Sequence, residues 1–275
     1  MQKAAKVIVT AHKEKFHVRI RDGTLLSFGL CCKVWRCLMR IQNVFKRYEI
    51  KYMISRRQQE KIMHGMEAYM TGDEYGRSTI CNLYFDTSSY LLIRRSIEHP
   101  VYKEKLRLRS YGTAESDSQV FLELKKKYQS VVYKRRIEIA ERDAMNCVRG
   151  KAKLGDTQIE RELDYFLRQY QYPQPAVFLS YEREAFYAKN EREFRVTFDE
   201  NILWRDSDLS LCAGAYGTPI LKEGQVLMEI KTGTSIPLWM TSLLTENHIY
   251  KTSFSKYGTV YKMLCEKQKG GFCYA

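Results

Sequence analysis

The sequence lacks the cysteine and histidine patterns that metal sites and disulfide frameworks need. Its eight cysteines include no Cys-x-x-Cys pair: Cys31, Cys32 and Cys37 cluster near the start, and the others stand singly. The five histidines show no ligand spacing with respect to the cysteines. These absences exclude a zinc ribbon and a dense disulfide scaffold, and we expect reduced thiols in a cytoplasmic protein.

Long apolar runs are absent too. No uninterrupted apolar stretch approaches the length that a helix needs to cross a bilayer. The apolar run LLSFGLCC, residues 25–32, is followed at once by Lys33 and by no small-residue cleavage site, so it is not a secretion signal. No Ser/His or Cys/His set typical of covalent catalysis is recognisable either.

Positive charge, by contrast, is plentiful. The chain carries 46 Lys and Arg against 32 Asp and Glu, a formal net charge of +14. This balance favours a polyanionic partner, such as nucleic acid, an anionic membrane surface or a phosphorylated small molecule. The many tyrosines and aliphatic residues argue against disorder.

Three parts follow one another along the chain. Residues 1–38 are basic and without clear periodicity, and are either an extension of the gene model upstream of Met39 or a basic arm for an anionic surface. Residues 39–268 carry the strong patterning expected of one folded domain, and residues 269–275 form a short tail. No internal repeat or low-complexity linker divides the patterned part.

The patterned part alternates between strand-like and helical segments. Period 3.6 and capping residues predict helices over 56–70, 91–96, 157–170, 237–247 and 256–268. Period-two alternation predicts strands over 44–54, 78–87, 105–112, 120–127, 131–140, 176–188, 193–200 and 225–233. Many strands with few flanking helices predict an α+β fold built on an antiparallel sheet or barrel.

One stretch, KEKLRLRSYG at residues 103–112, places a row of cations on one strand. Lys103, Lys105, Arg107 and Arg109 alternate, so they all point to one face, and the leucines point to the other. Further predicted strands repeat the arrangement: each polar face carries Lys or Arg, and several add one Glu. A solvated face explains any one such strand, but it explains six of them poorly.

If the sheet closes, these cations line its interior. Burial and mutual repulsion would then lower lysine pKa values or open the barrel unless a polyanion is bound. The few glutamates would serve as salt-bridge partners or as ligands of a hard divalent cation. The residues therefore predict a barrel or deep groove for a phosphate-rich ligand. A nucleic-acid site is not expected, because it would present an open basic patch with exposed aromatics.

Eight motifs carry a resemblance to a known family: RYEIKY, LYFDT, KLRLRSYG, VFLELKKK with YKRR, SYEREAF, FRVTFD, LMEIK and FSKYG. In this order, over about residues 44–264, the sequence resembles the VTC-domain polyphosphate polymerases of the triphosphate tunnel metalloenzyme superfamily, in their stand-alone prokaryotic form. The resemblance implies an antiparallel β-barrel with a cationic lumen and flanking helices. It also implies metal-dependent transfer of the γ-phosphate of ATP to inorganic polyphosphate, with Mn²⁺ or Mg²⁺ as cofactor.

The matching motifs assign roles to residues of this chain. The resemblance implies that five cations clamp the reacting phosphates: Lys51, Arg107, Arg109, Lys125 and Lys134. It places the metal on Glu229 and substrate contacts on Tyr181, Arg183, Arg195, Ser255 and Lys256. Glu49, Glu123 and Lys231 share the same strand faces and are expected to bind substrate with them.

Two positions depart from the family pattern. Ser253 stands where eukaryotic members would have a further lysine, and Arg47 stands where the ExExK motif would have its first glutamate. Fewer carboxylates favour holding a long polyphosphate over hydrolysing a short triphosphate. A tunnel-fold triphosphatase and a non-enzymatic polyphosphate-binding module stay open as alternatives, and a membrane-protein partner outside this chain is compatible with either.

Overall fold

The computed structural model describes residues 8–12, 15–19, 25–29, 48–98, 100–129, 131–191, 193–233 and 235–270. The chain divides into two compact units, Met1–Asn43 and Val44–Ala275. In the first unit, β1 (Ile8–His12), β2 (Lys15–Arg19) and β3 (Leu25–Gly29) form an antiparallel sheet. These strands were not predicted, because five-residue strands show too few alternations to be told from irregular chain. Met39 and Arg47 lie outside the described residues.

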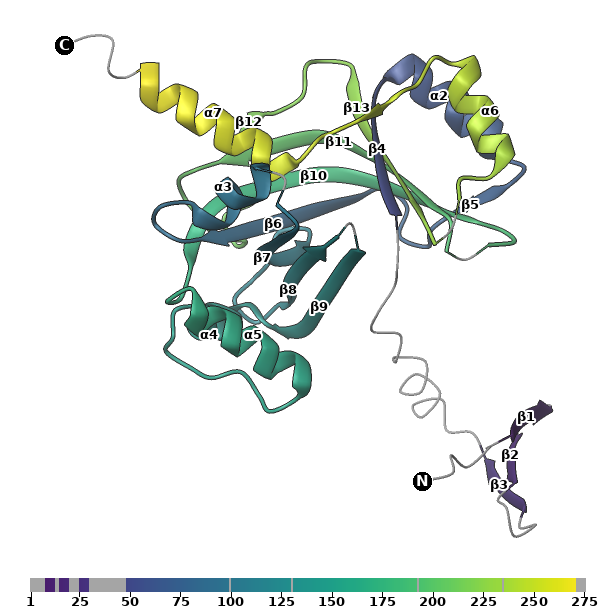
Figure 1. The fold of residues 1–275 in the computed structure, drawn as a ribbon, viewed down its shortest axis with the longest axis horizontal. Coiled ribbons are helices and arrows are strands. Elements are labelled where there is room, and N and C mark those ends of the chain that lie inside the picture. Colours follow the sequence, from purple (N-terminus) through teal and green to yellow (C-terminus); the bar gives the residue numbers. More distant parts are fainter. Residues whose placement is uncertain are drawn as a thin grey trace. The chain divides into compact units, whose positions relative to one another are not determined.

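The second unit is built on an 11-stranded antiparallel sheet (Figure 1). Its main path runs in the order β14-β4-β13-β11-β10-β6-β7-β8-β9, while β5 pairs with β10 and β12 with β11. The strands predicted from period-two alternation are confirmed. The bounds are β4 (Tyr48–Ser55), β5 (Met70–Gly72), β6 (Ser78–Asp86), β7 (Tyr102–Tyr111), β8 (Gln119–Tyr128), β9 (Val131–Ala140), β10 (Gln174–Ala188), β11 (Arg195–Arg205), β12 (Thr218–Pro219), β13 (Gln225–Thr232) and β14 (Lys251–Thr252).

Helices connect these strands, and two of them begin at well-formed caps. Ser55 caps α2 in a capping box with Gln58, and Thr157 caps α5 in the same way with Glu160. The predicted helix at 56–70 ends early, because Met70 begins β5. The bounds are α2 (Arg56–Met66), α3 (Leu91–Ile97), α4 (Glu141–Val148), α5 (Gln158–Gln169), α6 (Leu238–Glu246) and α7 (Lys256–Gly270), of which α4 was not predicted.

The helices cover the sheet in pairs, as Figure 1 shows. Helices α4 and α5 pack on the apolar face of β6, β7 and β8, and α2 and α6 pack on the apolar face of β4, β11 and β13. The third pair, α3 and α7, packs against Leu179 and Tyr181 of β10, on the same face as Arg183. That face, which we call the inner face, is therefore apolar under α7 and charged farther along.

The antiparallel sheet and flanking helices expected from the sequence are present, but strand pairing does not confirm a closed barrel. Hydrogen bonds join β4 to β13 and β14, and β9 to β8, but within the described residues none joins β9 to β4 or β14. In the part of the chain that the structure describes, strand pairing therefore does not close the sheet: β14 has only two residues, and β9 pairs with β8 alone. Side chains cross the inner face instead: Lys125 of β8 donates to Glu49 of β4 at 2.6 Å. In the described residues, no helix is both long and apolar enough to cross a membrane.

Candidate functional site

The register of the strands brings the predicted cations to one face. Lys105, Lys125 and Lys134 lie directly opposite one another across β7, β8 and β9. Towards the other end of the strand order, Glu229 of β13 lies between Lys51 of β4 and Thr197 of β11. Residues that pair in register project to the same face. Seven strands therefore contribute predicted site residues to the inner face.

Glu123 of β8 is the centre of the first group of charges. Its side chain is only 1% exposed. Arg107 donates to it through Nε at 2.8 Å and also donates to the Tyr84 hydroxyl at 3.0 Å. Lys134 pairs with its other oxygen, and Arg109 lies 3.7 Å away. These cations hold the pKa of Glu123 far below its usual range, even though burial by itself would raise it.

Asp199 of β11 is the centre of the second group. Arg183 donates to both of its oxygens, at 2.6 and 2.7 Å, and Lys256 at the start of α7 donates to Oδ2. Asp199 is fully buried, so this bidentate contact fixes the guanidinium plane of Arg183. Tyr181 lies against both cations, with its ring centroid 5.0 Å from Arg183 Cζ and 4.3 Å from Lys256 Nζ.

Glu229 lies among cations farther along the inner face. Its carboxylate is 3.6 Å from Lys231 Nζ and 3.8 Å from Arg183 Nη2. Arg195, which is opposite Lys231 in register, lies farther out, 3.7 Å from Asp73 and 4.6 Å from the ring of Tyr187. Arg195 is therefore the predicted site residue least engaged with the other site residues.

The chain segment before α7 is held by two lysines. Lys51 Nζ donates to the carbonyl of Phe254 at 2.9 Å, and Lys105 Nζ donates to Ser255 Oγ at 3.1 Å. Ser255 also accepts from the backbone N–H of Gly258. Strands β4 and β7 are thus bridged by this segment and not by strand pairing. Ser253, the position that departs from the family lysine, is exposed in this segment.

Burial and neighbouring charges shift the pKa values of several inner-face residues. Burial, followed by the charge of Lys51, lowers the pKa of Lys105 to about 7. Burial lowers the pKa of Lys231 to about 8, although the charge of Glu229 acts in the other direction. Burial would raise the pKa of Tyr181, but the charges of Arg183 and Arg109 outweigh it and lower that pKa to about 7. A bound polyanion would remove most of this repulsion.

Comparison with known families decides what kind of domain holds this site. The family model of the VTC domain matches residues 46–265. The chain belongs to the VTC-domain family. The match covers all of the strands that carry the two charge centres, and it confirms the resemblance found in the motifs. No curated protein matches this VTC domain in sequence.

Several solved structures match this chain at low sequence identity. A protein from Bacillus halodurans assigned as an adenylate cyclase has 13% identity and a TM-score of 0.49, covering 78% of this chain and 94% of its own. One from Vibrio parahaemolyticus, with the same assignment, has 11% identity and a TM-score of 0.45, covering 80% and 99%. One from Hippeastrum, assigned as an adenylyl cyclase with a dominant triphosphatase activity, has 17% identity and a TM-score of 0.46, covering 78% and 94%. Because every TM-score is below 0.5, we base no conclusion on them.

The carboxylates of this VTC domain fit a divalent cation only in part. Among the described residues, no group of three His, Cys, Asp or Glu side chains could hold a metal ion. Glu229 and Glu49 are near enough for their charges to act on each other. Magnesium is commonly bound by one or two carboxylates together with substrate phosphates. This donor set therefore fits a cation that arrives with its phosphate ligand.

Sequence reasoning did not assign three residues that matter in this VTC domain. Asp199 shares the inner face by parity, but parity does not tell which cation a carboxylate will pair with. Asn82 and Tyr84 of β6 accept hydrogen bonds from Arg109 and Arg107. Their alternation within the apolar strand STICNLYFD was the available signal, and it points both side chains at the cationic row of β7.

Proposed function

We propose that this VTC domain is a polyphosphate polymerase that transfers the γ-phosphate of ATP to a growing chain of inorganic polyphosphate. The observation that supports it most is the excess of cations over carboxylates on the inner face. The cations include Lys51, Lys103, Lys105, Arg107, Arg109, Lys125, Lys127, Lys134, Arg136, Arg183, Arg195, Lys231 and Lys256; the carboxylates include Glu49, Asp86, Glu123, Glu138, Asp199 and Glu229. Such an excess suits a ligand that carries one negative charge per phosphate.

Phosphoryl transfer mainly requires positioning and neutralisation of charge. The bond between the γ-phosphorus and the bridging oxygen to the β-phosphate breaks, a new bond forms to a terminal oxygen of the chain, and ADP leaves. Arg107 and Arg109 would clamp phosphate oxygens as planar donors, and Lys51, Lys125 and Lys134 as point charges. Glu123 would position Arg107 and Lys134, and Asp199 would position Arg183 and Lys256, rather than touch phosphate, because their oxygens are already paired with these cations.

Glu229, with Glu49 nearby, would hold Mn²⁺ or Mg²⁺ against the phosphates. A divalent cation bound there neutralises charge that develops on the transferring phosphoryl group. Lys231 and Arg183 contact the same carboxylate, so they keep Glu229 ionised across the physiological range; burial would raise its pKa, but the charges of Lys231 and Lys51 keep it well below the usual value. The remaining predicted contacts, from Tyr181, Ser255 and Lys256, border the same interior.

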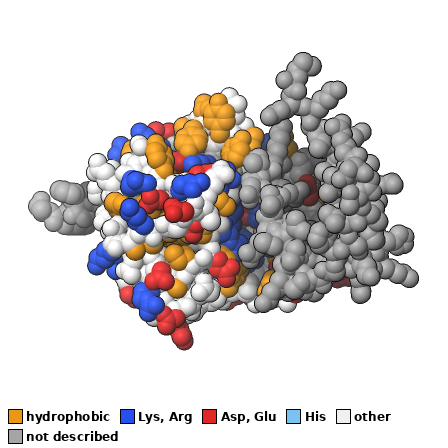
Figure 2. All heavy atoms as spheres, turned by 90° about the horizontal axis from the view of Figure 1, so that it is seen from below, with side chains coloured by type: hydrophobic (Ala, Val, Ile, Leu, Met, Phe, Trp, Pro, Cys, Tyr) orange, Lys and Arg blue, Asp and Glu red, His pale blue; other side chains and the backbone are white. Residues whose placement is uncertain are grey.

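Nucleic acid is not the polyanion that this arrangement suits. On the face drawn in Figure 2, basic side chains are interspersed with acidic ones and do not gather into one patch. The cations named above alternate instead along strands that face the interior. We therefore propose ATP and inorganic polyphosphate as the ligands.

Incubation of the purified protein with ATP and either Mn²⁺ or Mg²⁺, with and without a polyphosphate primer, tests the proposal. ADP, acid-insoluble polyphosphate and free phosphate are measured in one sample. ADP formed in step with polymer identifies a polymerase. ADP formed in step with free phosphate identifies a triphosphatase, and tight polyphosphate binding without ADP identifies a binding module. Either of the last two results contradicts the proposal.

A further inference from the structure

Beyond the residues assigned above, lysines continue along the inner face of β7 and β8. Lys103 lies directly opposite Lys127, and Lys105 directly opposite Lys125, at the end of these strands next to Tyr102 and Tyr128. Like charges opposite each other on one face of a sheet are destabilising. Four lysines in two adjacent cross-strand pairs therefore need an explanation.

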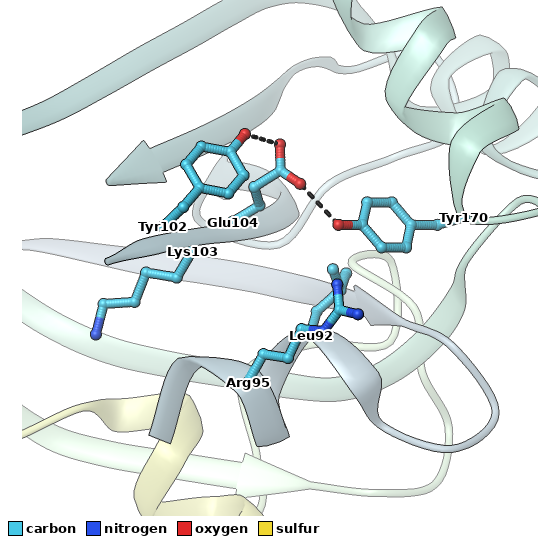
Figure 3. Close-up of a pocket in the computed structure, with 6 residues that line it drawn as sticks. All are labelled: Leu92, Arg95, Tyr102, Lys103, Glu104 and Tyr170. Carbon is cyan, nitrogen blue, oxygen red and sulfur yellow. Dashed lines mark hydrogen bonds between the residues drawn. The ribbon is translucent and has the colours of Figure 1, made fainter. Parts of the chain in front are cut away.

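The outer face of the same two strands behaves differently. There Lys126 lies 3.9 Å from Glu104, and Glu104 also accepts from the hydroxyls of Tyr102 and Tyr170, at 2.5 and 2.8 Å. Figure 3 shows that Lys103 points away from this cluster. Lys126, on the outer face, thus has a carboxylate partner.

Of the four inner lysines, Lys125 pairs with Glu49, and the other three have no such partner among the described residues. In the part of the chain that the structure describes, no carboxylate is paired with Lys103, Lys105 or Lys127 within 4.0 Å. Lys103 donates instead to the carbonyl of Ser96 in α3 at 3.2 Å, and Lys105 to the hydroxyl of Ser255. Burial and then the charges of Lys127 and Lys125 lower the pKa of Lys103. Lys103 and Lys105 are thus held by neutral groups, and no carboxylate of the described residues compensates their charge.

We propose that Lys103 and Lys127, continuing from Lys105, form a track that binds phosphates of the polymer next to the transfer site. The identity of the polyanion rests on the proposed function; the track itself rests on the unpaired row. Alternate residues on a strand are about 6.8 Å apart, so the track offers cations at regular steps to a linear chain of phosphates. Lys103 and Lys127 lie one cross-strand pair beyond Lys105 and Lys125, on the side away from Arg107 and Arg109, and Lys103 donates to α3.

Binding of two inorganic probes, tripolyphosphate and a long-chain linear polyphosphate, tests the track. The variant is Lys103→Gln with Lys127→Gln. The control removes equal charge outside the inner face, by Lys126→Gln with Lys151→Gln. We expect the variant to bind the long chain roughly tenfold more weakly, with a salt dependence shallower by about two contacts, and to bind tripolyphosphate as the parent does. We also expect the melting temperature of the empty variant to rise, because like-charge repulsion is removed.

The outcomes separate the track from the proposed function. Selective loss of long-chain affinity supports the track even if the parent makes no polymer from ATP, in which case only the proposed function fails. The track is overturned if the control loses as much affinity as the variant, if tripolyphosphate binding falls equally, or if long-chain affinity is unchanged. It is also overturned if the parent binds both probes equally tightly.

Discussion

Two buried carboxylates of the inner face illustrate how neighbours, and not residue type, set a role. Glu123 is surrounded by Arg107, Lys134 and Arg109, and its oxygens are already engaged. Glu229 touches its cations only at 3.6 Å and beyond, so it keeps oxygens free for another ligand. Removing Glu123 would leave several cations without a partner, whereas removing Glu229 would change the site more than the fold.

The cationic row of β7 gives the first prediction. Arg107→Ala should lower polyphosphate synthesis by about 100-fold or more, as removal of one preorganised donor commonly does. The melting temperature should change little, because Lys134 and Arg109 still face Glu123. Turnover and thermal unfolding are measured on the same sample. Arg142→Ala, an exposed arginine beside Asp117, is the control. Near-parental turnover of the Arg107 variant would show that this arginine is no phosphate clamp.

Glu229 gives the second prediction. Glu229→Gln should lose synthesis yet bind polyphosphate at least as tightly as the parent, since the variant removes a negative charge from an anion site. A glutamate with a structural role only would instead weaken stability and binding together. Turnover, binding and melting temperature are measured on this one variant. Retained turnover would contradict the assignment of Glu229 as the carboxylate that holds the metal.

At the scale of whole elements, a buried carboxylate links α3 to α7 next to Lys256. Asp86 of β6 is fully buried and accepts from the backbone N–H groups of Leu92 and Ile93 in α3. It also accepts from the Tyr257 hydroxyl in α7 at 2.9 Å, next to Lys256. One carboxylate therefore joins both helices that cover the apolar end of the inner face.

Removing this link is the third prediction. Tyr257→Phe should cost about 1.5–3 kcal/mol of unfolding free energy, the usual worth of a hydrogen bond to a charged group. Chemical denaturation measures it. Tyr261→Phe, also in α7 but packed on Tyr90, is the control and should cost less. Equal costs for the two variants would contradict a specific role of the Asp86 contact.

The predictability of this fold differed with element length. Long strands such as KLRLRSYG and VVYKRRIEIA show several alternations, so their faces could be assigned from sequence. The two-residue strands β12 and β14 and the three-residue strand β5 carry no periodic signal. Because β14 lies at the seam, the sequence could not tell a closed barrel from an open sheet. Pairings such as Arg183 with Asp199 depend on the register between two strands, which alternation within each strand does not provide.

For the molecule as a whole, the cationic interior couples stability to pH. Lys105, with a pKa of about 7, and Lys231, with a pKa of about 8, would both titrate near 10.5 in the unfolded chain. Between these values the unfolded chain binds more protons than the folded one, so the stability of the empty protein rises with pH. Tyr181, with a pKa of about 7 instead of 10, acts in the same direction.

The last prediction follows from this coupling. The melting temperature of the empty protein should rise between pH 7 and pH 9. Long-chain polyphosphate at low salt should raise the melting temperature most at pH 7 and so flatten the rise, because bound phosphates keep the lysines protonated. High salt should weaken the ligand effect. Lys105→Met should reduce the rise, whereas Lys126→Met, which removes the same charge from the outer face, should keep it. If the melting temperature of the empty parent stays level or falls over this range, the pKa values of the interior lysines are not lowered as described. If the ligand effect does not depend on pH, polyphosphate does not reach these lysines.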